Sequence, residues 1–448
     1  MSILLAGRHF LVIGAKRTGM ATARFLAVEG ARVRLADQEA GGFDAERRAL
    51  ATLAVEWRLG GGGEELLDGI DAVVPSPGVP PTGALLTAAK RRGIPILSEI
   101  ELASRFLSVP IHAITGTNGK STTTELVGDM LRRAGLRTFV GGNLGTPLVE
   151  AVGRPLDAAV VEVSSFQLEW TEQFRPAVAA FLNLTDDHLD RYASREEYGE
   201  AKTRLFARQT AEDWAVLSRE DPWVWERRHG VRSRVVSFGF DPVELGAFVR
   251  DDRVIVRLPD GGNGEETFSL ERTRLSGLHN LENVMAAALV ARLAGAPAAA
   301  VQETIDAFPG LPHRLELVRE KDGVRWVDDS KGTNVGAVVK SLASIRGPVI
   351  LLAGGVEKGG SYDPLRPLVR DRVKRLVLFG EARQTLLQEL GHDTDAVIAV
   401  DLEDAVRCAA EVARAGDTVL LSPACASFDM FRDYAERGER FRALVEAL

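Results

Sequence analysis

A glycine-rich segment at 116–122, GTNGKST, contains the residue types that hold a phosphate chain. An apolar stretch at 111–115 predicts a strand before it, and a helical pattern follows it. Ile114 stands where the longer form of this motif has glycine, so a shorter G-x-x-G-K-S remains. The loop N–H groups would surround the phosphates, with Lys120 at the β- and γ-oxygens and the Ser121 hydroxyl on Mg²⁺. The residues predicted to bind ATP or GTP are Gly116, Thr117, Asn118, Gly119, Lys120, Ser121 and Thr122.

Two further polar residues are predicted to lie beside this loop. Glu162 lies near the end of an apolar strand at 158–163, and His188 follows another strand at 178–184. Since the carboxyl ends of parallel strands meet at one edge of a sheet, both side chains should face the loop. A carboxylate there is the usual second support for Mg²⁺, and an imidazole can be a further ligand. A lone histidine is more often an ordinary polar residue, but three converging strand ends favour a metal site.

An earlier glycine turn, at 14–19, has the spacing G-x-x-x-x-G between a predicted strand at 9–13 and a helix at 20–29. The start of that helix offers N–H groups and a positive dipole end to a phosphate. Asp37 ends the next strand, where an acidic residue commonly meets a ribose or a base. A purely structural turn is one alternative, and an NAD-dependent dehydrogenase is another. The missing middle glycine argues against the dehydrogenase.

The elements that must position these residues alternate between strand and helix along most of the chain. The expected class is therefore α/β, with mainly parallel sheets and flanking helices. Breaks in the pattern divide the chain into three domains, at 1–98, 99–311 and 312–448. We expect Rossmann-like first and third domains and a central domain with the phosphate loop. Strand signals between 245 and 275, around a glycine-rich turn at 261–264, predict a small β-hairpin insertion in the central domain.

Composition excludes several classes of protein. The 448 residues are 45% hydrophobic and 26% charged, which is typical of a globular chain with ample core. The net charge of −8 argues against nucleic acid as a partner, because that surface needs a dense positive field. Two cysteines imply no disulfide framework, which fits a reducing cytoplasm. No apolar run reaches the ~18 residues of a membrane span, and Arg8 and His9 interrupt the N-terminal apolar stretch, unlike a signal peptide.

Short motifs along the whole chain resemble the Mur ligase family. They are GTNGKST at 116–122, EVSSFQL at 162–168, NLTDDHLDR at 183–191, EAK at 200–202, GLHN at 277–280, HR at 313–314, DDSKGTN at 328–334 and SPACASFD at 422–429. The phosphate loop and the HR pair occur across the family. VSSFQL, DDSKGTN and SPACASFD are typical of the members that add D-glutamate. The resemblance covers all three expected domains.

The resemblance implies an ATP- and Mg²⁺-dependent amide ligase of peptidoglycan precursor synthesis in the cytoplasm. The carboxylate of UDP-N-acetylmuramoyl-L-alanine would attack the γ-phosphate of ATP, giving an acyl phosphate and ADP. The amine of D-glutamate would then attack the acyl carbon and release phosphate. A free carboxylate is a poor acyl donor at neutral pH, so phosphorylation supplies the leaving group. We expect a monomer whose partners are these small molecules, with no nucleic acid and no membrane span.

The resemblance also implies roles for single residues. The implied catalytic residues are Lys120, His188, Lys202 and Lys331. The implied ligands of two Mg²⁺ ions are Ser121, Glu162, His188 and Lys202. Lys202 alone, in a predicted helix at 198–206, would be a solvated lysine, whereas carbamylation would convert it to an anion with two metal-binding oxygens. The implied contacts of ATP outside the loop are Asn280 at the adenine, Asp329 at the ribose and Arg314 at the phosphates.

Two more sets of residues are implied to bind the other substrates. The D-glutamate site would consist of Thr333, Lys358, Ser427 and Phe428. The uridine-diphosphate site would consist of Thr18, Gly19, Asp37, Ser76 and Gly78, with Asn143 toward the sugar. Cationic and hydroxyl groups suit a dicarboxylate, since each carboxylate needs charge-assisted partners away from water. Tyr434 stands where the family can have phenylalanine, which adds a hydroxyl to the amino-acid pocket.

Other functions share part of this pattern. Mur ligases that add L-alanine, a diamino acid or a dipeptide share the ATP residues, but the motifs typical of D-glutamate addition argue against them. A folylpolyglutamate synthase also shares the ATP and metal residues, but it should lack the first domain. A regulatory P-loop ATPase would leave the third-domain motifs without purpose, and it would hydrolyse ATP whatever amino acid is present.

Overall fold

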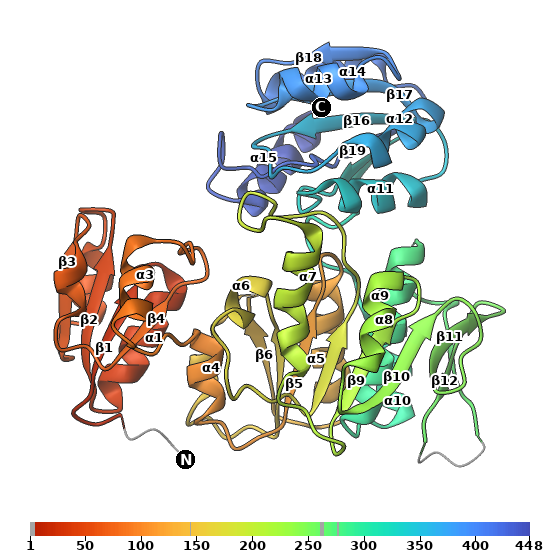
Figure 1. Cartoon of the computed structure of the whole chain (residues 1–448). Helices are drawn as coiled ribbons and strands as arrows, with labels where there is room; N and C mark the ends of the chain where they lie inside the picture. The colour runs from red at the N-terminus through yellow and green to blue at the C-terminus, as the bar shows by residue number, and fades with distance from the viewer. Residues whose placement is uncertain (1–4, 144, 260–263, 276) are drawn as a thin grey trace.

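The computed structural model describes residues 5–143, 145–259, 264–275 and 277–448. Three parts follow one another along the chain, each built on its own sheet, with 4, 9 and 6 strands (Figure 1). Helices flank the sheets, and most neighbouring strands are parallel. The expected α/β class with mainly parallel sheets is confirmed.

The first sheet has the strand order β3-β2-β1-β4, and all its strands are parallel. The elements of this part are β1 (His9–Ile13), α1 (Arg17–Val28), β2 (Arg32–Asp37), α2 (Asp44–Ala49), β3 (Val55–Leu59), η1 (Glu64–Leu67), β4 (Ala72–Pro75) and α3 (Ala84–Arg91). The sequence pattern does not predict β3, because this edge strand is only partly buried and lacks an apolar run. α4 (Glu99–Ser104) leads into the second part.

The central sheet has the order β13-β12-β11-β10-β9-β8-β5-β7-β6. Its strands are β5 (Ile111–Thr115), β6 (Thr138–Gly142), β7 (Ala158–Glu162), β8 (Val178–Phe181), β9 (Trp214–Ser218), β10 (Arg234–Gly239), β11 (Gly246–Arg250), β12 (Arg253–Arg257) and β13 (Glu266–Ser269). Its helices are α5 (Lys120–Arg133), η2 (Leu148–Ala151), α6 (Ser165–Leu168), α7 (Arg195–Thr203), η3 (Arg204–Phe206), α8 (Pro222–Glu226), η4 (Arg227–His229), α9 (Leu278–Leu293) and α10 (Ala298–Ala307).

The strands expected at 245–275 are present as β11, β12 and β13, which pair antiparallel in succession, but they do not form a separate insertion. β11 pairs in parallel with β10, so the hairpin strands extend the edge of the central sheet. Most of the predicted turn at 261–264 lies outside the described residues.

The third sheet has the order β14-β15-β19-β16-β17-β18, with only β14 antiparallel to its neighbour. The elements are β14 (Glu316–Lys321), β15 (Val324–Asp328), α11 (Val335–Ser344), β16 (Val349–Gly354), η5 (Asp363–Leu365), α12 (Arg366–Arg372), β17 (Val373–Phe379), α13 (Arg383–Leu390), β18 (Ala396–Ile398), α14 (Leu402–Val412), β19 (Thr418–Leu421) and α15 (Tyr434–Ala447). β19, the last strand in the chain, therefore lies in the interior of its sheet.

The phosphate loop joins β5 to α5, and its last position requires glycine. Gly119 has a φ of 84°, and a Cβ atom there would lie 2.2 Å from Asn283 Oδ1. Residues with a side chain rarely adopt this backbone conformation. α5 and α9 pack together against the central sheet through one apolar cluster, which contains Leu126 and Met285. This packing fixes the loop at the carboxyl end of β5.

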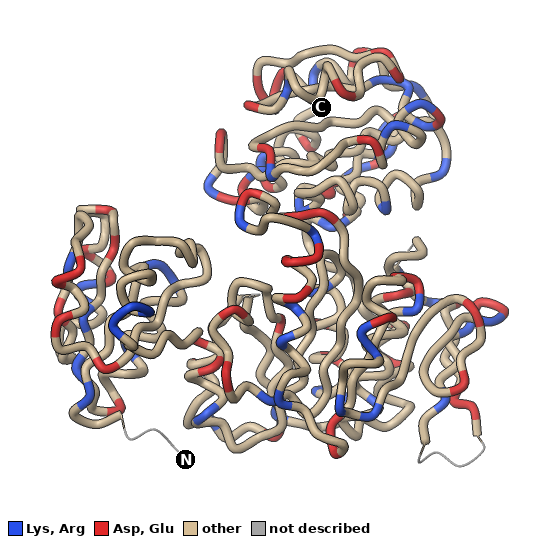
Figure 2. The backbone as a smooth tube through the Cα atoms, viewed as in Figure 1, with Lys and Arg blue, Asp and Glu red and all other residues tan. Residues whose placement is uncertain are grey.

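Figure 1 shows the first part beside the central part and the third part above α7 and α9. Lys and Arg are interspersed with Asp and Glu in all three parts (Figure 2). Among the described helices, none is long and apolar enough to cross a membrane.

Candidate active site

The phosphate loop is held by the end of a neighbouring strand. Asn183, which follows β8, accepts hydrogen bonds from the N–H groups of Asn118 and Thr117, both at 2.9 Å. Lys120 Nζ donates to the carbonyls of Gly116 and Thr117 at 2.9 and 2.8 Å. Burial lowers the pKa of Lys120. These contacts, which hold the backbone of the loop, all lie within the central part.

Glu162 ends β7 and is 3% exposed. Its Oε1 accepts a hydrogen bond from the Asn143 side chain at 2.7 Å, whereas its buried Oε2 has no hydrogen-bond partner among the described residues. Burial alone would raise the pKa of this carboxyl, but the ammonium groups of Lys120 and Lys331, with hydrogen bonds, outweigh burial and lower the pKa. A buried, ionised oxygen without a partner is a donor that Mg²⁺ prefers, so these residues fit the metal.

His188 lies in a tight turn after β8, in the left-handed region with a φ of 56°. The N–H groups of Arg191 and Tyr192 close the turn by donating to the His188 carbonyl at 3.0 and 3.1 Å. Burial lowers the pKa of His188 to about 4, although the Asp187 carboxylate opposes the shift. The imidazole is therefore neutral near pH 7, which is the form that binds a metal.

Lys202, on α7, is 1% exposed, so the alternative of a solvated lysine is wrong. Its Nζ donates to the Gly116 carbonyl at 3.0 Å and lies 4.4 Å from the centre of the Tyr198 ring. Burial, followed by the charge of Lys120, lowers the pKa of Lys202 well below its usual value. A neutral amine is the form that reacts with carbon dioxide, so the environment of Lys202 fits carbamylation.

Two cations of the third part reach the phosphate loop. Arg314 Nη2 and Lys331 Nζ donate to the Ser121 hydroxyl at 3.2 and 3.0 Å. Burial lowers the pKa of Arg314, and it lowers the pKa of Lys331 to about 7. Within the described chain, the buried Nε of Arg314 has no partner. This arrangement gives the loop cationic donors that can still bind the oxygens of a phosphate.

A cavity beside the loop is lined by residues of the central and third parts. Its lining includes Asn118, His279, Asn280, Asn283, Arg314, Asp329, Lys331 and Lys340. Asp329 accepts hydrogen bonds from the hydroxyls of Ser341 and Ser422, both at 2.7 Å, and burial raises its pKa to about 6. The structure thus brings the predicted adenine, ribose and phosphate residues to one cavity.

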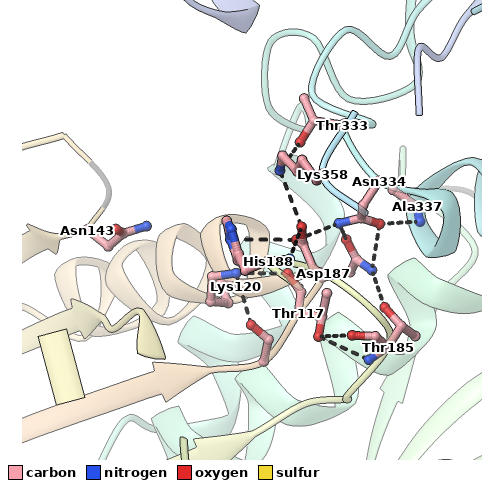
Figure 3. A network of polar contacts seen from close by, with 12 residues as sticks. Thr117, Lys120, Asn143, Thr185, Asp187, His188, Thr333, Asn334, Ala337 and Lys358 are labelled. Atoms are coloured by element: carbon pink, nitrogen blue, oxygen red, sulfur yellow. Dashed lines mark hydrogen bonds and ion pairs between the residues drawn. The ribbon is translucent and has the colours of Figure 1, made fainter. Parts of the chain in front are cut away.

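The predicted amino-acid residues Thr333 and Lys358 belong to a network around Asp187 (Figure 3). Lys358 Nζ donates to the Thr333 hydroxyl at 3.2 Å and lies 3.4 Å from Asp187 Oδ1. Asn334 donates to Asp187 Oδ2 at 3.0 Å. The third part therefore places a lysine and a hydroxyl next to the turn of His188.

Asp187, Asn183 and Asn334 are absent from the predicted site residues, although all three organise the site. Each lies inside a motif, NLTDDHLDR or DDSKGTN, and Asp187 and Asn334 are adjacent to the predicted residues His188 and Thr333. Their signal was therefore present, but only the fold shows that they are buried and bonded across elements.

Ser427 and Phe428 follow β19 and differ in burial. Ser427 is buried, and its carbonyl accepts from the Phe431 N–H at 2.9 Å. Phe428 is 73% exposed. Their contact with a substrate stays a prediction.

Residues of the first glycine turn gather at the carboxyl ends of β1, β2 and β4. The Asp37 carboxylate accepts from the Ala15 N–H at 2.6 Å, and Ser76 Oγ lies 3.4 Å from the Gly14 carbonyl oxygen. A Cβ atom on Gly19 would lie 1.7 Å from that same carbonyl, so only glycine fits there. Asp37 is thus already bonded to the turn.

The neighbouring positions complete this region. Thr18 lies in the first turn of α1, where its carbonyl accepts from the Thr22 hydroxyl at 2.8 Å. Gly78 lies in the turn after β4, which the Val79 N–H closes by donating to the Ser76 carbonyl at 3.0 Å. Asp37 and Val79 also line a cavity in the first part. Asn143, predicted at the sugar, bonds Glu162 in this structure.

Comparison with known proteins matches successive segments to one family. The matching descriptions are "Mur ligase MurD-like, N-terminal domain" at 8–98, "Mur ligase middle domain" at 114–291 and "Mur ligase, glutamate ligase domain" at 313–425. The chain is 49% identical over 452 residues to the UDP-N-acetylmuramoylalanine–D-glutamate ligase of Geobacter metallireducens, covering 99% of this chain and 98% of the relative. It is 48% identical over 458 residues to the protein of the same name from Pelobacter propionicus, covering 99% and 100%.

Solved structures show the same fold. The MurF ligase of Thermotoga maritima in complex with ADP is 19% identical with a TM-score of 0.60 and covers 100% of each chain. The UDP-N-acetylmuramate-alanine ligase MurC of the same organism is 18% identical with a TM-score of 0.60, covering 98% of this chain and 99% of that one. Because relatives with nearly half their residues identical span almost its full length, the chain belongs to the Mur ligase family.

Proposed function

We propose that this protein joins D-glutamate to UDP-N-acetylmuramoyl-L-alanine, using ATP and an acyl-phosphate intermediate, in peptidoglycan precursor synthesis. The observation that carries the proposal is the meeting at Ser121 of Arg314 and Lys331, beside the unpartnered oxygen of Glu162. Such a site suits phosphoryl transfer. The choice of substrates is supported by the full-length relatives that carry this name.

ATP would lie between the central and third parts. Lys120 would exchange its bonds to two loop carbonyls for the β- and γ-phosphates, and the loop N–H groups would surround the chain. Asn280 and Asp329 would hold the adenine and the ribose. Bound Mg²⁺, on Ser121, Glu162, His188 and a carbamylated Lys202, would neutralise phosphate and carboxylate charge.

Arg314 and Lys331 would act during transfer of the γ-phosphoryl group. Both already point at Ser121 from the third part, so they would face the phosphate that this hydroxyl supports. Fixed cations in a site without water stabilise the charge that develops in transfer. A phosphate anion beside Lys331 would raise its pKa above about 7 and keep it charged.

D-glutamate would bind next to the acyl group. Lys358 contacts Asp187, which precedes His188 in the turn, and Thr333 accepts a hydrogen bond from Lys358. The two side chains would offer a positive charge and a hydroxyl to the carboxylates of the amino acid. Ser427 and Phe428 would complete this pocket. The amine would then be held close to the acyl phosphate, which favours its attack over that of water.

We also propose the domain boundaries 1–98, 99–311 and 312–448, which are supported by one complete sheet within each range. The first domain would bind the uridine diphosphate through Thr18, Gly19, Asp37, Ser76 and Gly78, with Asn143 toward the sugar. A cytoplasmic monomer remains our proposal for the working form, and small molecules for its partners.

The test is phosphate release from ATP and Mg²⁺ with UDP-N-acetylmuramoyl-L-alanine and a panel of amino acids. We expect release with D-glutamate and none with L-glutamate, L-lysine or diaminopimelate. Release with another amino acid would keep the ligase and overturn the assignment to D-glutamate. Release that ignores every amino acid would overturn ligation itself.

A further inference from the structure

Arg191 connects the first and central parts of the chain, and the proposed reaction does not use it. It is the last residue of NLTDDHLDR and lies in the same tight turn as His188. We propose that Arg191 is a positioning residue that fixes the 76–79 turn of the uridine-diphosphate site relative to the turn of His188. This inference rests on the proposed function, because it concerns the alignment of the two ends of that substrate.

On one side, Arg191 holds the first part. Its Nη1 donates to the carbonyls of Pro77 and Val79, each at 3.2 Å. These carbonyls flank Gly78, in the turn that places Ser76 against Gly14. Arg191 therefore bonds the backbone of the segment that lies against the first glycine turn.

On the other side, Arg191 is anchored in the central part. Its Nε and Nη2 donate to the Glu169 carboxylate at 3.1 and 2.6 Å, and the Tyr192 hydroxyl donates to that carboxylate at 2.5 Å. The guanidinium lies 4.0 Å from the centre of the Phe166 ring. The His188 ring meets the same Phe166 ring edge-on, with centres 4.7 Å apart. A continuous series of contacts thus joins the 76–79 turn to the predicted metal ligand.

The bonding of Arg191 indicates positioning and not catalysis. Donors on all three guanidinium nitrogens already bond protein oxygens. The Arg191 and Glu169 side chains are only 9% and 14% exposed, so water screens this pair less than a surface pair. Lysine lacks the planar fork that serves a carboxylate and two carbonyls together.

The alignment matters because the substrate must bind at both ends. The first domain would hold its uridine diphosphate, while the central domain would hold its L-alanine carboxylate near His188. If the two half-sites shift relative to each other, the substrate cannot engage both of them fully at once, and its binding weakens. Removing Arg191 should therefore weaken use of this substrate and spare ATP and D-glutamate.

The experiment compares Arg191→Ala and Arg191→Lys with Arg204→Ala as a matched control. Arg204 bonds the same central segment, through the carbonyls of Leu168 and Thr171, but none of its hydrogen bonds described here reaches the first part. For Arg191→Ala we expect the KM for UDP-N-acetylmuramoyl-L-alanine to rise about 10-fold or more. The KM values for ATP and D-glutamate should stay within about twofold. The KM of Arg191→Lys for UDP-N-acetylmuramoyl-L-alanine should lie between those of the wild type and Arg191→Ala. Arg204→Ala should leave all three KM values near those of the wild type.

Calorimetric binding of UDP-N-acetylmuramoyl-L-alanine without ATP gives a readout that does not need ligation, and Arg191→Ala should weaken it by a similar factor. An unchanged KM and affinity for this substrate in Arg191→Ala, or an equal loss in Arg204→Ala, would overturn the inference. If Arg191→Ala fails to fold, Phe166→Leu should shift the same KM in the same direction by a smaller factor, and no shift would count against it. Wild-type protein that shows no D-glutamate-dependent release would instead contradict the proposed function.

Discussion

At the scale of single residues, the loss of surrounding water shifts the pKa values of the buried ionisable side chains. Glu162 remains ionised because neighbouring ammonium groups outweigh its burial, whereas burial lowers the pKa of Lys202. Burial likewise lowers the pKa of Lys331, to about 7. Perturbed groups of this kind gather at functional sites because catalysis needs charge states that water would not give. These pKa shifts suit Glu162 as a metal ligand, Lys202 as an amine that is carbamylated, and Lys331 as a hydrogen-bond donor to phosphate.

The first prediction concerns Lys202. Lys202→Ala should lower kcat by about 100-fold or more, because the variant has no amine to become a metal-binding carbamate. Added propionate should restore part of the activity by supplying carboxylate oxygens in the space of the side chain, without helping the wild type. Phosphate release with D-glutamate measures both effects. Full activity of Lys202→Ala at low bicarbonate would exclude the carbamate.

Among the elements, α4 is joined to the rest of the central part by buried carboxylates as well as by apolar packing. Glu101 accepts hydrogen bonds from the N–H groups of Glu172 and Phe174, both at 2.9 Å. Glu99 accepts from the Val149 N–H at 2.6 Å, while its buried Oε2 lacks a partner in the described chain. Burial raises the pKa of Glu99 to about 7.

The second prediction is a pH dependence of stability that comes from Glu99. Its folded pKa of about 7 lies above the ordinary 4.5, so the folded state binds the proton more tightly. The stability from this group is full below 4.5 and is lost as pH rises through about 7, by about 3 kcal/mol in all. The thermal midpoint of Glu99→Gln should therefore rise relative to that of the wild type as pH rises. The exposed Glu29→Gln is the control, and a gap independent of pH would refute the prediction.

α15 is fixed by Arg437, which is 0% exposed. Its Nε donates to the Ser330 hydroxyl at 3.0 Å, its Nη2 to the Ser330 carbonyl at 2.8 Å, and its Nη1 to the Gly354 carbonyl at 3.4 Å. These partners precede Lys331 and the Lys358 loop in the chain. One helix thus supports two segments of the site.

The third prediction follows from these bonds. Arg437→Met should lower the free energy of unfolding of the third part by about 3 kcal/mol, because buried carbonyls lose their donors. Arg440→Met, on the same helix with its side chain 52% exposed, should change it by less than about 0.5 kcal/mol. Denaturant unfolding of both variants gives the comparison. Equal stability of the two would contradict the role of Arg437.

The sequence predicts β1 and β5 at the bounds that the structure has, because both are buried apolar runs next to glycine turns. It misses the edge strands β3 and β14, whose residues are half-exposed or exposed and in which charged side chains interrupt the apolar ones. It also misses contacts between distant segments, such as Arg191 with Pro77, 114 residues apart. Local patterns specify burial and period, but the partner of a side chain depends on how whole elements pack.

For the whole molecule, the apolar clusters show how the parts are joined. Residues of the first and central parts share one cluster, whereas the clusters of the third part contain only its own residues. The third part meets the central part through polar contacts, which include Arg314 and Lys331 with Ser121, Lys358 with Asp187 and Lys340 with Glu282 at 2.7 Å. Polar interfaces of this kind permit domain motion.

The fourth prediction concerns this boundary. Calorimetry should show the third part unfolding in a transition of its own without nucleotide. A non-hydrolysable ATP analogue with Mg²⁺ should bring the transitions together, because nucleotide bound at the proposed site would link both parts. An excess of about 100-fold over its Kd would contribute about 2.7 kcal/mol. AMP, which lacks the β- and γ-phosphates, should bring the transitions less close together. A single transition under both conditions would contradict this account.

The interior position of β19 affects how the protein is made. Translation proceeds from the N-terminus, so β15 and β16 leave the ribosome before the strand that lies between them. The bonds of the phosphate loop to Asn183 and to the Lys120 ammonium can form while the third part is still an open sheet, because they lie earlier in the chain, whereas its bonds to Asn334, Arg314 and Lys331 must wait for the third part. Thr333 and Lys358 come into place only after Thr418–Leu421 has been synthesised and inserted. We therefore expect a newborn chain to form its phosphate loop first, and a chain cut short near its end to keep that loop and lack the proposed amino-acid pocket.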